Sequence, residues 1–487
     1  MRPSCSPFTT FPCCKPSIST TRSRRIPSAL DRRRWSRRCR RRAKNDERPG
    51  WFIRTRLSAR GQLEKVKPRF RSEHIFIPLL FVTGLIAWGD RVNISIAAPH
   101  IMEEFDWGAD VMGLVFSAFG WGYLLAQLWT GWLSDRWGGI KTLAAAMAGW
   151  SLATLLTALP RSAGIMGLIR GLLGVCESAY GPAQAAVITQ SFPPNDVPRA
   201  LTMCISATAL GPVVAVPLAS TIVATSGWRM VFLVFGAFGL IWAGVLFLFA
   251  RWVLGTLTPE VASARRSERT PLLDVLKRRP VWGLGLAYLP NTFTYYFVAN
   301  WMPTYLIKAR GFTLLESGFY TALPFLCTFL LEGSTGWISN GLMDRGWSRR
   351  WARKIILYVG STGVVGCLLL AGSTSSPALA VIGISAAMGL VGGNIAALWI
   401  IATDMTLRRV GTVTGFMSLI GSLGAILAPA LAGFIVEATG RWEYALYMTG
   451  LVNVVTFLVT GTLISTERLS GLPGSATVRE VAFEDGD

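Results

Sequence analysis

Apolar runs about as long as a membrane is thick recur between residues 75 and 465, and they constrain the fold more than any other feature of the sequence. About 20 residues of α-helix span the roughly 30 Å hydrocarbon core of a bilayer. Of the 487 residues, 51% are hydrophobic and only 15% are charged, so little of the chain suits a water-exposed surface. We therefore predict an all-α, multi-pass membrane protein.

A charged segment at 252–280 divides the apolar runs into six before it and six after it. The twelve expected transmembrane helices cover 75–98, 109–132, 140–159, 163–190, 199–224, 229–251, 281–306, 315–337, 352–372, 377–402, 411–436 and 443–465. The pattern predicts a six-helix bundle over 74–251, a cytoplasmic linker at 252–280 and a second six-helix bundle over 281–465. A short acidic tail at 466–487 follows.

Basic residues gather in the loops after the even-numbered helices, and cytoplasmic loops are the ones that carry excess Lys and Arg. These residues are Arg136, Lys141, Arg199, Arg265, Arg266, Arg269, Lys277, Arg278, Arg279, Arg345, Arg349, Arg350, Arg353, Lys354, Arg408 and Arg409. The loop after the first helix is acidic instead. Both termini are therefore expected to be cytoplasmic.

Most of the net charge of +21 lies in residues 1–73, which hold 22 Lys and Arg against 5 Asp and Glu. The remainder is close to neutral, so its charge gives no reason to expect nucleic-acid binding. We expect a disordered basic extension. Two origins stay open for it: a segment similar to an organellar transit peptide, or translation upstream of a true start near Val66.

The eight cysteines and two histidines show no spacing typical of a metal site or a disulfide framework. No nucleotide-binding motif and no nucleophile–base arrangement is apparent either. We therefore expect no metal, no cofactor and no enzymatic activity.

Four charged residues interrupt the apolar runs: Asp90 and Arg91 in the first helix, and Arg170 and Glu177 in the fourth. A charge at the centre of a membrane helix costs roughly 2.5–3.5 kcal/mol on insertion scales and commonly marks an ion or substrate path. Arg170 and Glu177 are seven residues apart, which places them about 20° apart on one helix face. A neutral structural network is the competing interpretation, but a set on two helices favours function.

The two halves of the chain resemble each other. GWLSDRWGGIKT begins at Gly131, after the second helix, and GWISNGLMDRGWSRR begins at Gly336, after the eighth. This correspondence indicates a duplication, hence two pseudo-symmetric bundles around a central cavity, a common plan for transporters.

GWLSDRWGG resembles the loop motif of the major facilitator superfamily, and the degenerate second copy matches its internal repeat. DRVNISIAAPHI, RGLLGVCESAYGPA, SFPPNDVPRA and SGWRMVF are similar to segments of its anion:cation symporter family, and they occur in the same order. The likeness covers about residues 75–465. It implies transport by alternating access of the two bundles.

Residue chemistry suggests separate roles for the four charges. An Arg guanidinium stays charged and its planar fork fits a carboxylate, so Arg91 and then Arg170 are the candidate substrate ligands. Burial favours the neutral form of a carboxyl group and a neighbouring Arg favours the charged form, so Asp90 and Glu177 are the candidate proton carriers. The family resemblance implies the same assignment, because its sugar-acid/proton symporters use an acid and an Arg in helix 1 and an Arg and a Glu in helix 4.

Further cavity candidates are polar or aromatic. The family resemblance implies cavity positions for Tyr123 and Asn394. The seventh helix adds Tyr288, Asn291 and Tyr295 beside two prolines that weaken its backbone hydrogen bonding, as expected of a gating helix.

The loop motif predicts a conformational latch. The Asp135 carboxylate faces the same side as the N-terminus of the eleventh helix near Gly411 and can interact with the positive end of that helix. Gly131 and Gly139 permit close approach of the backbone, and Arg136 accompanies the carboxylate. We expect these residues to latch the bundles rather than to contact substrate.

The sequence thus predicts a monomeric secondary transporter that imports a small organic anion, such as a sugar acid, together with protons. A sodium-coupled phosphate or anion transporter, an anion exchanger and, less favoured, a transporter-like sensor remain alternatives. We expect a bacterial inner membrane, or a chloroplast or other organelle envelope if residues 1–73 are a transit peptide.

Overall fold

The computed structural model describes two short strands, at 55–57 and 63–65, and residues 73–192, 197–254, 278–405 and 410–464, apart from a few side chains. The strands, β1 (Thr55–Leu57) and β2 (Leu63–Lys65), pair antiparallel within a unit that spans Met1–Phe70. All the described helices belong to the second unit, Arg71–Asp487.

Six helical passes precede the linker, and each coincides with an expected transmembrane helix. Their helices are α2 (Glu73–Phe105), α3 (Ala109–Trp137), α4 (Gly139–Leu156), α5 (Ala163–Glu177), α6 (Tyr180–Ser191), α7 (Val197–Ile205), α8 (Ala207–Ser226) and α9 (Trp228–Leu254). The fourth pass is broken into α5 and α6. Pro182 explains this break, because its ring clashes with the carbonyl of the residue four earlier, Ser178.

Six passes also follow the linker, as the sequence predicts. Their helices are α12 (Arg279–Arg310), α13 (Leu314–Asp344), α14 (Arg349–Ser373), α15 (Pro377–Met405), α16 (Val410–Thr439), α17 (Trp442–Val452) and α18 (Val454–Thr462). The last pass is broken at Asn453, whose side chain donates to Thr449 O and to the Thr294 hydroxyl of α12. The twelve-helix fold class is confirmed.

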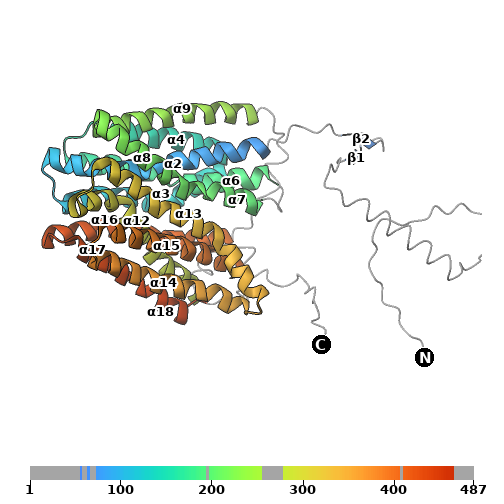
Figure 1. The fold of residues 1–487 in the computed structure, drawn as a ribbon. Helices are drawn as coiled ribbons and strands as arrows, with labels where there is room; N and C mark the ends of the chain where they lie inside the picture. Colours follow the sequence, from blue (N-terminus) through green and yellow to red (C-terminus); the bar gives the residue numbers. More distant parts are fainter. Residues whose placement is uncertain are drawn as a thin grey trace, which may run out of the picture. The chain divides into compact units, whose positions relative to one another are not determined.

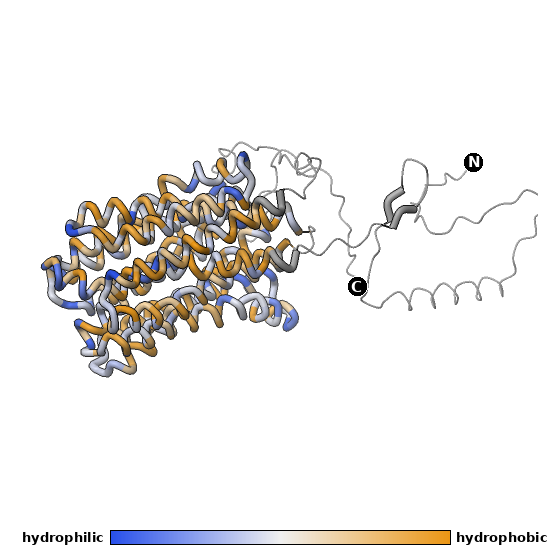
Figure 2. Tube along the Cα trace, turned by 90° about the horizontal axis from the view of Figure 1, so that it is seen from above, coloured by the Kyte–Doolittle hydropathy of each residue, from blue (hydrophilic) through white to orange (hydrophobic). Residues whose placement is uncertain are grey.

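Ten described helices are long and apolar enough to cross a membrane. The two other passes are α5–α6, which is broken, and α12, which is rich in polar residues. Both carry candidate site residues. Hydrophilic residues gather at the two ends of the helical body, and apolar residues run along its length (Figure 2).

The first six passes pack mainly on one another, and so do the last six, which gives two bundles side by side (Figure 1). Among the described helices, the main contacts between the bundles are made by three pairs: α3 with α16, α8 with α13, and α2 with α12. The first two pairs are equivalent under the repeat, because the second pass corresponds to the eighth and the fifth to the eleventh. The structure therefore has the pseudo-two-fold arrangement that the duplication predicts.

The bundles are in tight contact at the end where α2 stops and α3 starts, which we call the Asp106 end. Ala109 N, at the start of α3, donates to Glu437 Oε2 of α16 over 2.8 Å. The Ser117 hydroxyl donates to Ile426 O over 2.6 Å. A Cβ on Gly113 would lie 2.6 Å from Pro429 O, so glycine is required for this approach. This end of the interface is closed.

Candidate functional site

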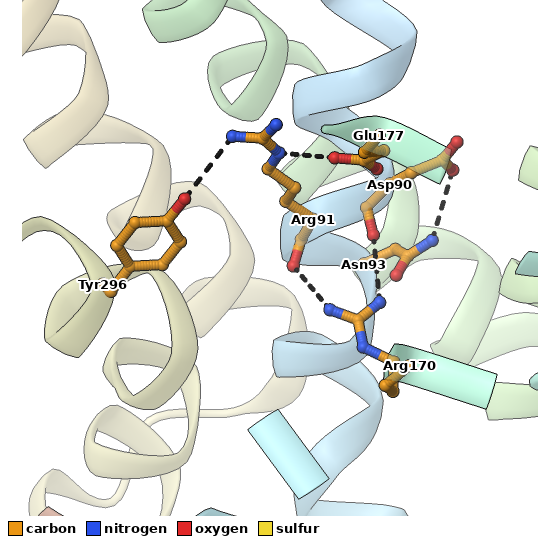
Figure 3. A network of polar contacts seen from close by, with 6 residues as sticks. All are labelled: Asp90, Arg91, Asn93, Arg170, Glu177 and Tyr296. Atoms are coloured by element: carbon orange, nitrogen blue, oxygen red, sulfur yellow. Dashed lines mark hydrogen bonds and ion pairs between the residues drawn. The ribbon is translucent and has the colours of Figure 1, made fainter. Parts of the chain in front are cut away.

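The charged residues predicted from the sequence meet in one buried network between α2 and α5 (Figure 3). Arg91 Nε donates to Glu177 Oε2 over 2.5 Å, and the two side chains are 6% and 0% exposed. Removing one partner of a buried ion pair leaves an uncompensated charge, at a typical cost of about 3–5 kcal/mol. Arg91 and Glu177 thus depend on each other in this conformation.

Arg91 also links the two bundles. Its Nη1 donates to the Tyr296 hydroxyl of α12 over 3.4 Å (Figure 3). Its guanidinium lies over three aromatic rings of its own bundle, 4.1 Å from the ring centroid of Trp88, 5.2 Å from that of Tyr123 and 5.3 Å from that of Phe119. Such cation–π contacts fix the position of the guanidinium and stabilise its charge.

Arg170 holds the backbone of α2 rather than a carboxylate. Its Nη1 and Nη2 donate to the carbonyl oxygens of Asp90 and Arg91, each over 3.4 Å. Arg170 therefore ties α5 to the backbone of α2 at the two residues, Asp90 and Arg91, whose side chains belong to the network. Arg170 also lines the cavity beside Arg91.

Asp90 is fully buried and receives a 3.5 Å hydrogen bond from Asn93 Nδ2 on its Oδ1. Its Oδ2 and Glu177 Oε1 are buried without a hydrogen-bond partner among the described residues. Each acid thus has an oxygen that can take a proton or a ligand. The net charge of the network can therefore change when a proton or a ligand binds to one of these oxygens.

Local sequence explains how α5 presents Arg170 and Glu177. The break beyond Glu177 makes it the last residue of α5. A Cβ on Gly174 would clash with the backbone of α3 at Phe119, so glycine lets α5 pack against the helix that carries Phe119 and Tyr123. The small residues of this helix therefore bring the acid, the base and the aromatic rings together.

A small cavity of about 10 Å³ lies beside Arg91. Its lining includes Trp88, Arg91, Arg170, Tyr295, Tyr296 and Asn300. That volume suffices for about one water molecule. A sugar acid needs more room, so substrate binding requires the two bundles or the Arg91 side chain to move.

The candidates in the second bundle fall into two groups. Tyr295 faces the first bundle, with its ring edge-on to Trp88 at 5.6 Å and its hydroxyl buried without a described partner. Asn394 Nδ2 instead donates to Asn291 Oδ1 over 3.0 Å, and Asn291 donates to Ala287 O. These two amides therefore join α15 to α12 inside their own bundle. Tyr288, on α12, packs against Gly421.

The predicted latch residues are only partly described. Gly139 packs against the backbone of α6, where a Cβ would lie 2.6 Å from Ala183 O, whereas a Cβ on Gly131 would meet nothing within 4 Å. Arg136 is exposed over the Trp132 ring. The side chain of Asp135 and the surroundings of Gly411 lie outside the described residues.

Sequence reasoning missed several residues that line the cavity, among them Trp88, Phe119 and Asn300. Trp88 lies three residues from Arg91, and Phe119 lies four residues from Tyr123, both of which it noted. Helix neighbours at that spacing share a face, so this signal was available. Among the described residues, no group of three or more His, Cys, Asp or Glu side chains is placed to hold a metal ion.

Comparison with known proteins agrees with this architecture. A family model described as Major Facilitator Superfamily matches residues 80–406 and 342–480. The chain is 29% identical over 415 residues to a D-galactonate transporter of Escherichia coli O6:H1, covering 80% of this chain and 95% of that protein. It is also 29% identical over 408 residues to sodium-dependent phosphate transport protein 1, chloroplastic, of Arabidopsis thaliana, covering 79% and 78% respectively.

The fold is also similar to a solved structure. This is the crystal structure of a bacterial homologue of the human lysosomal transporter Spinster, in an inward-facing and unoccupied conformation. The TM-score is 0.69 at 18% sequence identity, and the match covers 83% of this chain and all of that one.

Proposed function

Because this chain belongs to the major facilitator superfamily, whose members are transporters and not enzymes, we propose that it imports a small organic anion together with protons. A sugar acid is the favoured substrate, because relatives that match most of the chain include a D-galactonate transporter. The observation that carries the proposal is the buried pair of Arg91 and Glu177, in contact with Tyr296 of the other bundle.

The pair provides a physical route to coupling. When Glu177 is ionised, it occupies Arg91 and competes with any other anion for the guanidinium. A proton on Glu177 removes that competitor and leaves a buried cation, which a substrate carboxylate can neutralise with a bidentate contact. Asp90 is the second proposed proton carrier, since its Oδ2 has no described partner.

Alternating access uses the two bundles, 74–251 and 281–465, joined by the linker 252–280. Glu437 and the N-terminus of α3 hold them together at the Asp106 end. At the opposite end of the same antiparallel helix pair, Asp135 near the end of α3 and the N-terminus of α16 form the second latch. The two latches alternate during the cycle.

We also propose the membrane, the orientation and the oligomeric state of the protein. Both termini face the cytoplasm of a bacterial inner membrane, and the transporter acts as a monomer. A chloroplast envelope is the alternative, consistent with the chloroplastic relative in Arabidopsis thaliana.

Sodium-coupled phosphate transport is the second candidate, favoured by the name of that same relative. The two functions differ in the driving ion and in the substrate. Uptake into proteoliposomes under a pH gradient or under a sodium gradient separates them.

The deciding variant for proton coupling is Glu177→Gln, which keeps the shape of the side chain and cannot ionise. We expect it to lose uptake driven by a pH gradient and to keep exchange of labelled for unlabelled D-galactonate. Loss of both activities would show a structural role instead. Arg91→Ala is the matching test of the anion site, and retained D-galactonate affinity in that variant would refute the assignment.

A further inference from the structure

One charged residue deep in the second bundle takes no part in the network of Arg91. Glu332 lies in α13, half-buried, twelve residues before the helix ends at Asp344. At 1.5 Å per residue it is about 18 Å from that end. The other described charges of this bundle lie within about two turns of a helix end. They are Arg278, Arg279, Lys308, Arg310, Glu316, Asp344, Arg345, Arg349, Arg350, Arg353, Lys354, Asp404, Glu437, Arg441 and Glu443.

Helix geometry gives the direction in which Glu332 points. Gly318, Phe325 and Glu332 are spaced by seven residues, so each is about 20° from the next around α13. Gly318 packs closely on Ser220 in α8 of the first bundle. The Phe325 ring meets the Tyr295 ring edge-on at 5.6 Å. Glu332 continues this stripe, so it lies on the side of α13 that faces α12 and the other bundle.

The neighbours of Glu332 on α12 are tyrosines. Helices α12 and α13 follow each other in the chain and run in opposite directions. Tyr288 comes two turns before Tyr295, and Glu332 comes two turns after Phe325, so Tyr288 and Glu332 share a level. The carboxylate interacts electrostatically with both tyrosines. Among the described residues, Glu332 makes no hydrogen bond or ion pair.

A lone carboxylate near an anion site repels a simple anion, but it binds hydroxyl groups well. A sugar acid has both kinds of group, with a carboxylate at one end and hydroxyls along its carbon chain. Tyr295 lines the cavity beside Arg91. Tyr288 and Glu332 lie two helical turns farther along α12 and α13, at the level deduced above. Hydrogen bonds from hydroxyls to an ionised acceptor are stronger than those between neutral groups.

We propose that Glu332, together with Tyr288, forms the hydroxyl-binding subsite of the transporter, across the bundle interface from Arg91. Arg91 holds the carboxylate of the substrate, and Glu332 accepts hydrogen bonds from its hydroxyls. Glu332 thereby selects polyhydroxylated acids over plain carboxylates. This inference rests on the proposed function, because it assigns a second part of the same substrate.

The test is calorimetric titration of the purified full-length protein with D-galactonate and with hexanoate, which has the same carbon skeleton without the hydroxyls. We expect Glu332→Ala to weaken D-galactonate binding roughly 10- to 100-fold, the range for a lost hydrogen bond to a charged group. Hexanoate binding should be unchanged or stronger. Glu332→Gln should retain part of the D-galactonate affinity, because its amide oxygen still accepts. Asp344→Ala, at the exposed end of the same helix, is the matched control and should change neither.

Two results would overturn the subsite while leaving the proposed function in place. They are full D-galactonate affinity in Glu332→Ala, or an equal loss for both ligands in Glu332→Ala and Glu332→Gln. If the wild-type protein binds neither acid, the proposed function fails and the subsite fails with it. Thermal melting of each variant identifies a loss that comes from unfolding.

Discussion

Adding one methyl group at Gly113 should open the contact between the bundles at the Asp106 end. The Cβ of Gly113→Ala would lie 2.6 Å from Pro429 O and 3.3 Å from Ala430 Cα, both backbone atoms of α16. The Pro429 carbonyl also accepts a hydrogen bond from Trp301 Nε1 over 3.0 Å, which restrains it further. No flexible side chain is present to absorb the clash.

The size of the effect follows from the geometry. An ordinary van der Waals contact begins at 3.4 Å, so α3 and α16 must separate by about 0.8 Å at this point. Overpacking of this kind typically costs about 1–3 kcal/mol. Only the conformation closed at this end bears the strain. The ratio of open to closed molecules should therefore rise roughly 5- to 150-fold.

Pulsed electron paramagnetic resonance measures this shift directly. Spin labels at Glu103 and Thr439, both exposed near the Asp106 end, report the separation of the two bundles in a protein whose native cysteines are replaced. We expect Gly113→Ala to increase the population at longer distance.

Gly244→Ala, in α9 of the same bundle, is the control for Gly113→Ala. It makes the same change of residue type in a membrane helix, at a position where a Cβ would meet nothing within 4 Å. It should leave the distances unchanged. An unaltered distribution in Gly113→Ala, or the same shift in both variants, would refute the reasoning.

Three further variants test other contacts. Glu437→Gln removes the carboxylate at the start of α3 and should shift the same spin-label distances in the same direction by less, because such a charge contributes about 0.3–1 kcal/mol. Asn394→Ala removes the hydrogen bond that Asn291 Oδ1 accepts and should lower the free energy of unfolding by about 1–3 kcal/mol. The melting temperature should fall, and the affinity for D-galactonate should stay unchanged. The ammonium group of Arg170→Lys lacks the planar fork that donates to the carbonyls of Asp90 and Arg91. D-galactonate transport should therefore fall while the protein stays folded. Unchanged transport would show that the two hydrogen bonds from Arg170 are not needed for transport.

The twelve passes could be predicted from the sequence because hydropathy and bilayer thickness leave few alternatives. The breaks within the helical passes were harder to predict from the sequence. Pro182 signals the break between α5 and α6, but it can also be accommodated in a continuous membrane helix. The apolar run predicts that the first helix ends at 98, whereas α2 continues to Phe105. The difference arises because hydropathy records the apolar core and not the polar turns beyond it.

Which charges pair could not be predicted from the sequence. Asp90 adjoins Arg91 in the chain, but consecutive residues on a helix point about 100° apart. The partner of Arg91 is Glu177, 86 residues away, and the bond depends on how α2 and α5 pack. The contact with Tyr296 depends further on how the two bundles meet. The hydrogen bond from Asn394 to Asn291 likewise depends on how α15 packs on α12.

The central claim is that a proton on Glu177 releases Arg91 for the substrate carboxylate. Calorimetric titration of D-galactonate in buffers of different ionisation enthalpy measures proton uptake on binding. We predict net proton uptake by the wild-type protein and clearly less uptake by Glu177→Gln, with binding retained. Equal proton uptake by the two proteins, or no uptake by the wild type, would contradict the account.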